Sequence, residues 1–150
     1  MKPETIVARN RRARHDYEIL ETLEAGIVLL GAEVKSVRQG NVNLREGYAV
    51  VEGGEAFLHG VHVSPYDPAD RWNPSPTRRR KLLLNKREIR MLAQRIDEKG
   101  LTIVPLDIHF RNGFAKMTLA VGRGKKHYDK REAMKRRELD REAERELGRR

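Results

Sequence analysis

"LTIVPLDIHFRNGFAKMTLAV", residues 101–121, is the stretch that decides the fold. Apolar side chains alternate along its first half, and the alternation shifts by one residue across Pro105, which predicts a bulge or bend there. Asn112-Gly113 is the strongest short signal for a hairpin turn, and the alternation resumes after it. The stretch therefore predicts an antiparallel hairpin with one face in the core, formed by Leu101, Ile103, Leu106, Ile108, Phe110, Ala115, Met117, Leu119 and Val121.

More strands are expected upstream of this hairpin. Residues 17–23 and 26–30 are rich in apolar and β-branched side chains, and we expect two strands there, separated near Gly26. Residues 47–63 alternate on both sides of the two glycines at 53–54, which predicts a second hairpin whose turn needs positive φ. The body of the chain is thus expected to be mainly β.

Two helices and one long loop are expected between these strands. Apolar residues at helical spacing after residue 30 predict a short helix that stops at Gly40, and residues 64–81 hold four prolines and a cationic run, which predicts a loop. Asn85 with Glu88 is a variant of the capping box and predicts the start of a second helix, which ends at Gly100. The single apolar face of that helix comprises Ile89, Leu92, Ala93 and Ile96.

The fold class that follows is mainly β with helices. Five or more short antiparallel strands with interposed helices predict a small closed or half-closed antiparallel β-barrel of the OB-like type, with two to three α-helices and a basic C-terminal tail. An open α+β sheet is the alternative.

The positive charge is concentrated at the two ends of the chain. The formal net charge is +10, of which +3 lies in residues 1–16 and +5 in residues 122–150, where twelve Lys/Arg face seven Asp/Glu. We therefore expect a basic N-terminal extension (1–16), an OB-like RNA-binding β-barrel (17–121) and a basic tail (122–150). A near-neutral body with basic ends is typical of a polyanion binder. Neither end has the Trp/Phe/Leu face of an interfacial helix, so nucleic acid is favoured over a membrane.

Several other function classes are excluded by what the sequence lacks. It has no cysteine, and therefore no disulfide, thiolate nucleophile or Cys-ligated zinc, which favours an intracellular, cytoplasmic protein. It has no apolar run of the roughly 18 residues that a membrane helix needs, and none of the common catalytic motifs. His59 and His62 are expected on opposite faces of a strand, so they do not form a shared metal site. We expect no enzymatic activity, no cofactor and no metal.

Three basic stretches point to RNA. Residues 10–17 and 122–131 combine cationic side chains with Tyr and His, which supply donors for phosphates and planes that stack on unpaired bases. Residues 77–88 bring a run of four cations, 78–81, from a loop onto the start of a strand and helix. For each stretch alone, a solvated surface is the alternative. The tail beyond them has only a weak helical pattern, around Leu139 and Leu147, so we expect it to be disordered when free and helical on a partner.

Four separated blocks, in one order along nearly the whole chain, carry a resemblance to a known family. They are "NRRARHDYEI" near the start, "EAGIVLLGAEVKSVRQG" at 24–40, "RRKLLLNKREI" at 79–89 and "NGFAKMTLAVGRGKKHYDKRE" at 112–132. The chain resembles small protein B, the SsrA-binding protein family of bacteria, which partners transfer-messenger RNA (tmRNA) in ribosome rescue. Several blocks in one order make this resemblance specific.

For the body of the protein, the resemblance implies an oligonucleotide-binding barrel, one face of which cups the tRNA-like domain of tmRNA near its elbow. In that family the counterparts of four residues here belong to RNA-binding patches: Asn10, Glu24, Leu83 and Lys116. We expect one copy of the protein, as a monomer, to bind one tmRNA. With the basic stretches added, the expected RNA-binding residues are Asn10, Arg11, Arg12, Arg14, His15, Tyr17, Glu24, Arg78, Arg80, Lys81, Leu83, Asn85 and Lys116.

For the tail, the resemblance implies contact with the ribosome. The family's Gly-Lys-Lys and Asp-Lys-Arg stretches lie toward the ribosome, and its tail enters the empty mRNA channel at the 16S rRNA decoding centre and folds as a helix. Family tails often carry a Trp where Leu139 stands here, so a stacking contribution of about 1–3 kcal/mol is missing. The expected ribosome-facing residues are Gly124, Lys125, Lys126, Tyr128, Asp129, Lys130, Arg131, Lys135, Arg136, Arg137 and Leu139.

Two rival functions remain at this point. A general ribosome- or tRNA-binding OB-fold translation factor would bind ribosomal RNA and the tRNA-like domain with similar affinity. An RNA-acting enzyme such as a nuclease would show metal-dependent turnover, and the absence of a carboxylate cluster argues against it. With the resemblance, we expect a non-enzymatic factor that delivers tmRNA to stalled ribosomes for trans-translation and whose tail senses the empty mRNA channel.

Overall fold

The long C-terminal hairpin forms as its alternation predicts. The computed structural model describes residues 5–67 and 73–125, and in it β8 (Leu101–Arg111) pairs antiparallel with β9 (Phe114–Gly124). Asn112 and Gly113 form the turn with φ values of 52° and 81°. The register shifts between Pro105 and Asp107, which confirms the bulge. Met117, Leu119 and Val121 are fully buried in the core.

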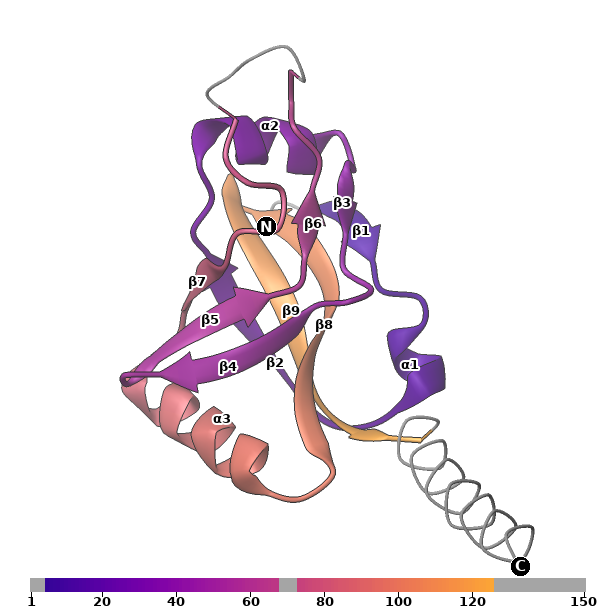
Figure 1. The fold of residues 1–150 in the computed structure, drawn as a ribbon, viewed down its shortest axis with the longest axis vertical. Helices are drawn as coiled ribbons and strands as arrows, with labels where there is room; N and C mark the ends of the chain where they lie inside the picture. Colours follow the sequence, from indigo (N-terminus) through magenta and orange to yellow (C-terminus); the bar gives the residue numbers. More distant parts are fainter. Residues whose placement is uncertain (1–4, 68–72, 126–150) are drawn as a thin grey trace, which may run out of the picture.

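Seven strands make one antiparallel sheet, in the order β1-β8-β9-β2-β7-β5-β4, and a small second sheet pairs β3 with β6. Within the described residues, the edge strands β1 and β4 do not pair with each other, so the sheet is not closed. It curls instead: β4 and β5 cross over the long strands, and β4 comes close to β8 (Figure 1). The remaining strands are β1 (Thr5–Arg9), β2 (Tyr17–Ile27), β3 (Val42–Asn43), β4 (Tyr48–Glu52), β5 (Glu55–His59), β6 (His62–Val63) and β7 (Arg80–Leu83).

The expectation of two strands within residues 17–30 is wrong. β2 runs without a break from Tyr17 to Ile27, with one register shift between Ile19 and Glu21. Gly26 makes no turn: its φ is not positive, and it pairs with Lys116 on one side and Leu83 on the other. A Cβ at this position would lie 3.1 Å from the Leu83 Cβ, so the glycine makes room for the Leu83 side chain.

The N-terminal segment is not an appendage to the sheet. β1 pairs with the outer edge of β8, and the short helix α1 (Ala13–Asp16) follows it. Ala13 is buried in a second apolar cluster with Val104, Leu106 and Ala120, on the opposite side of β8 and β9 from the main core. The predicted boundary at residue 16 therefore does not separate an extension from the body.

The two predicted helices are present. α2 (Gly31–Arg38) is followed by Gly40 with a φ of 77°. α3 (Lys86–Asp97) begins at a capping box: the Asn85 carboxamide oxygen accepts from the Glu88 amide, and the Glu88 carboxylate accepts from the Asn85 amide. Leu92 of α3 is fully buried, and α3 packs against β4 and β8 (Figure 1). None of the described helices is long and apolar enough to cross a membrane.

Candidate nucleic-acid interface

A row of paired residues crosses the outer face of the sheet. His109 pairs with Lys116, Lys116 with Gly26, and Gly26 with Leu83, so the row passes from β8 through β9 and β2 to β7. Directly paired residues share one face of a sheet, and neighbours along a strand alternate. Because Ile108 and Met117 point into the core, the row faces outward. Lys116 and Leu83, both predicted RNA-binding residues, are thereby brought together.

A second row lies beside the first. Glu24 pairs with Thr118, Thr118 with Asp107, and Asp107 with Arg9 of the edge strand. We name the two rows, without Arg9, the strand face: Glu24, Gly26, Leu83, Asp107, His109, Lys116 and Thr118.

Glu24 is held at both of its carboxylate oxygens. Oε2 lies 2.9 Å from His109 Nε2, and Oε1 accepts from Arg111 Nη1 at 2.9 Å. The hydrogen bond with His109, reinforced by the charges of Arg111, His109 and Lys116, lowers the pKa of Glu24 against the opposing effect of burial. Glu24 is therefore an ionised acceptor with a fixed orientation and a side chain that is 32% exposed.

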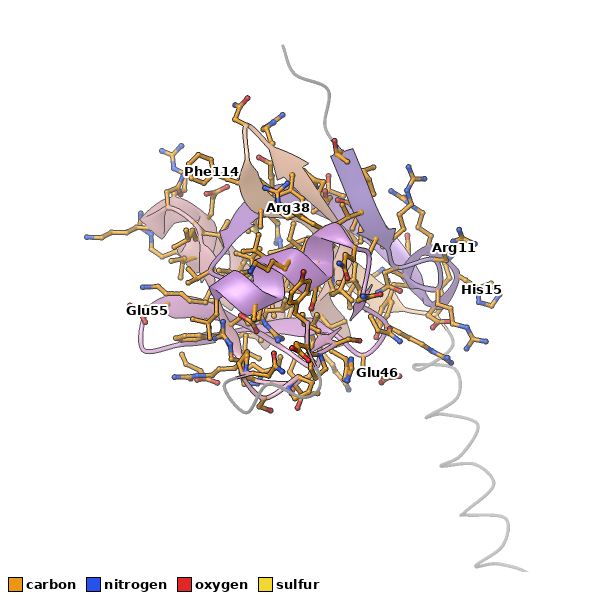
Figure 2. The ribbon with its side chains drawn as sticks, turned by 90° about the horizontal axis from the view of Figure 1, so that it is seen from above. Arg11, His15, Arg38, Glu46, Glu55 and Phe114 are labelled. Atoms are coloured by element: carbon orange, nitrogen blue, oxygen red, sulfur yellow. The ribbon has the colours of Figure 1, made fainter. Side chains whose placement is uncertain are left out.

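Two adjoining hollows next to β1 and α1 are lined by arginines. One is lined by Arg9, Asn10, Arg11, Arg12, Asn43 and Arg45, and we name it the arginine hollow. The other shares Arg9, Asn10 and Arg11 and reaches Arg14 and Asp107, so it joins the arginine hollow to the strand face. Figure 2 shows Arg11 and His15 projecting from this side of the molecule. Of the ion pairs formed among the described residues, none involves Arg9, Arg11, Arg12 or Arg14.

Asn10 and Tyr17 frame this region and are partly committed to the fold. The Asn10 carboxamide nitrogen donates to Pro105 O at 2.9 Å and to Leu44 O at 3.3 Å, which leaves its Oδ1 as the group able to meet a ligand. The half-buried Tyr17 ring lies on Gly122, where a Cβ would be 3.0 Å from the Tyr17 Cβ.

The expectation that Arg80 contacts RNA requires correction. Arg80 lies in β7 rather than in the loop, and it is 1% exposed. Its guanidinium binds the buried Glu33 carboxylate and the carbonyls of Val61, Arg78 and Pro76, so no donor remains for a phosphate. Arg78 also binds Glu33, with a side chain that is 27% exposed. This pair of arginines fastens β7 and the preceding loop to α2.

Lys81, Leu83 and Asn85 line a third, open hollow between β5, β7 and the start of α3. Lys81 is exposed and pairs with Glu55 at 3.1 Å, Leu83 is 55% exposed, and Asn85 uses its side-chain oxygen to cap α3. The full lining is Gly54, Glu55, Ala56, Lys81, Leu82, Leu83, Leu84, Asn85, Lys86, Glu88 and Ile89. Leu83 belongs to both this hollow and the strand face, so the two surfaces are continuous.

Two of the expected ribosome-facing residues are described. Gly124 ends β9, and the amide of the exposed Lys125 donates to Asp16 O at 2.8 Å, which ties the start of the tail to α1. The other expected residues lie outside the described part of the chain: Lys126, Tyr128, Asp129, Lys130, Arg131, Lys135, Arg136, Arg137 and Leu139.

Sequence reasoning missed Arg9, Arg45, Asp107, His109 and Arg111. The last three carry a signal, because they occupy the alternate positions of a strand whose other side chains are apolar. Arg9 and Arg45 carry none: they are 36 residues apart, and only the folded chain brings them to one hollow.

Comparison with known proteins gives one consistent result. A family model described as SmpB protein matches residues 7–149. The chain is 52% identical over 149 residues to the SsrA-binding protein of Latilactobacillus sakei subsp. sakei (strain 23K), covering 99% of this chain and 96% of the relative. It is 57% identical over 140 residues to the SsrA-binding protein of Geobacillus sp. (strain WCH70), covering 93% and 90%. A solved structure, "tmRNA-SmpB: a journey to the center of the bacterial ribosome", contains a chain that matches with a TM-score of 0.69 and 51% identity, over 79% of this chain and 83% of that chain.

Proposed function

This chain belongs to the SmpB protein family, and from that premise we propose how its surfaces serve that family's work. The protein is an RNA-binding factor and not an enzyme: it binds tmRNA and acts with it on the ribosome in trans-translation. Work on the ribosome assigns it to the cytoplasm. For the fold, we propose that the curled sheet is the half-closed form of an OB-like barrel.

The observation that carries the assignment of the RNA surface is the continuity of the strand face with the arginine hollow. Predicted RNA-binding residues from three distant parts of the sequence, Asn10, Glu24 and Lys116, meet on this one surface. Arg and Lys side chains without carboxylate partners suit phosphates, and a fixed carboxylate suits ribose hydroxyls or base amino groups. We assign the tRNA-like domain of tmRNA to this surface.

The tail from residue 126 is assigned to the ribosome. Its twelve-to-seven excess of cations, counted from Gly122, suits a channel of ribosomal RNA rather than a protein core. The described start of the tail supports the division of labour, because Lys125 leaves the body beside Asp16 and Tyr17, at the far end of β2 from Gly26.

A competition gel shift tests the assignment. The tRNA-like domain of tmRNA is labelled, and ordinary tRNA or ribosomal RNA fragments compete at about 150 mM salt, where exposed charges more than about 8 Å apart are screened. Displacement only by a large excess of competitor is the expected result, since the surface recognises the shape of one RNA. Displacement at equal concentration would replace this function with that of a general translation factor.

Replacing Lys116 by alanine is expected to weaken RNA binding and to flatten its salt dependence by roughly one counterion. Lys116 lies in the strand face near Glu24, and its charge helps to lower the pKa of that carboxylate. Affinity is measured against salt concentration for the wild type, Lys116→Ala and the control Lys99→Ala, whose lysine is exposed beyond α3. Equal slopes for all three proteins would exclude Lys116 from phosphate contact.

A further inference from the structure

One member of the strand face, His109, is a buried histidine between two carboxylates. His109 is 2% exposed; its Nε2 is 2.9 Å from Glu24 Oε2, and its Nδ1 is 2.6 Å from Asp107 Oδ1. The Thr118 hydroxyl donates to the same Asp107 oxygen at 3.0 Å. Both ring nitrogens of one imidazole therefore face oxygens of acidic side chains.

This geometry suits only the doubly protonated ring. A neutral imidazole has one N–H and one lone pair, whereas an ionised carboxylate can only accept. With two carboxylates in hydrogen-bond range, a neutral ring would direct its lone pair at one of them. The imidazolium donates to both and brings a positive charge between two negative ones.

We propose that the protonated His109 is a positioning residue of the RNA-binding surface. It holds the Glu24 carboxylate in one orientation and offsets the two negative charges beside which the phosphates of the RNA must lie. The inference rests on the proposed function, because it takes the strand face as the place where RNA binds.

The charged groups around His109 come from every strand that adjoins it. β2 contributes Glu24, β8 contributes Asp107 and Arg111, and β9 contributes Lys116. β1 contributes Arg9, which stands opposite Asp107 on the neighbouring strand. Loss of the His109 proton leaves these groups with one positive charge fewer and leaves one carboxylate without its donor. RNA affinity is therefore expected to fall as the pH rises.

The pH range follows from the surroundings of the ring. Burial lowers the pKa of His109, but the hydrogen bonds to Glu24 and Asp107 outweigh burial and raise that pKa above its usual 6.5. Because the folded pKa is the higher one, the contribution of His109 to stability is complete below pH 6.5 and is lost as the pH rises through the folded value. RNA affinity and the stability of the fold are thus both expected to fall as the pH rises. Each binding measurement is therefore accompanied by a check of folding by circular dichroism.

The experiment measures the affinity of the full chain for the isolated tRNA-like domain of tmRNA from about pH 6 to about pH 9 at fixed salt. Wild type is compared with His109→Gln, and with His62→Gln as the matched control, since His62 is exposed on β6 away from the strand face. His15→Gln is run in parallel because His15 is an exposed histidine among the predicted RNA-binding residues. His109→Gln is expected to bind about tenfold more weakly at low pH, the effect of losing a charged hydrogen bond, and to lose the pH dependence.

A second variant keeps the histidine and moves its titration. Asp107→Asn removes one of the two negative charges, so the midpoint of the affinity profile is expected at lower pH than in the wild type. Equal profiles for wild type and His109→Gln, or an unmoved midpoint in Asp107→Asn, would overturn the role of His109. Failure of the wild type to prefer tmRNA over ordinary tRNA at low pH would instead overturn the proposed function, so the two outcomes are distinguishable.

Discussion

Glu33→Gln is expected to lower the free energy of unfolding by about 3–5 kcal/mol, the effect of breaking a buried ion pair. The Glu33 carboxylate is 2% exposed, binds the guanidinium groups of Arg78 and Arg80, and accepts from the Leu30 amide at the start of α2. Glutamine keeps the shape but removes the charge that balances the buried Arg80. Urea unfolding at neutral pH measures the change.

Glu55→Gln is the matched control for this experiment. Glu55 pairs with Lys81 at 3.1 Å, but both side chains are about half exposed, so its replacement is expected to change stability by less than about 1 kcal/mol. A stability of Glu33→Gln equal to that of the control would show that the buried pair contributes no net stability, which hydrophobic replacements of buried pairs have shown to be physically possible.

The Glu33 carboxylate also makes the stability of the protein fall at acid pH. Burial raises the pKa of Glu33, yet its hydrogen bonds with Arg78, the Leu30 amide and Arg80 outweigh burial and lower that pKa below 4.5. Since the folded pKa is the lower one, this contribution is present above pH 4.5 and is lost as the pH falls through the folded value.

A chain that ends at Lys125 is expected to bind the tRNA-like domain of tmRNA with unchanged affinity and to lose trans-translation entirely. Every described strand and every described member of the strand face and the arginine hollow is retained in this variant. The readouts are a gel shift for RNA binding and the tagging of a stalled nascent chain in a reconstituted translation reaction. Parallel loss of both would show that body and tail do not act on separate partners.

A scrambled tail separates charge from sequence. A full-length variant whose residues 126–150 keep their composition in a different order has the same net charge as the wild type. If the tail acts by fitting the mRNA channel, this variant is expected to fail in rescue as the truncated chain does. Full rescue by the scrambled tail would reduce its role to general attraction by ribosomal RNA.

Local signals with a single physical meaning were sufficient to predict several elements. Asn112-Gly113 requires a turn, Pro105 disturbs a strand, and the Asn85–Glu88 pair satisfies the first amides of a helix, so each could be placed from sequence. Gly26 misled because a glycine can serve either a turn or a close approach. Only the partner strand, which brings Leu83 against it, decides between the two.

The candidate site was predictable in its residue types but not in its assembly. The three consecutive arginines at 78–80 suggest a phosphate-binding site. In the structure, however, Arg79 pairs with Glu52 at the surface, and Arg80 turns inward and pairs with Glu33. Which arginine is buried depends on the face that β7 presents to α2, and this is a property of the fold. The meeting of Glu24, His109 and Lys116 likewise depends on strand register, which the sequence of one strand does not contain.

Because β2 runs without a break, it fixes the distance between the point where the tail leaves the body and the strand face. The tail leaves the body beside Tyr17, and Glu24 lies seven residues further along the same strand, so at about 3.3 Å per residue roughly 23 Å separate the two points. Deleting one residue between them would turn the Glu24 side chain toward the core. Deleting two would return it to the outer face of the sheet but shorten the distance between the two points by about 7 Å. With the tail assigned to the ribosome and Glu24 to the RNA, as proposed, the number of residues in β2 sets the distance between these two contacts, so this strand is expected not to tolerate the length variation of a surface loop.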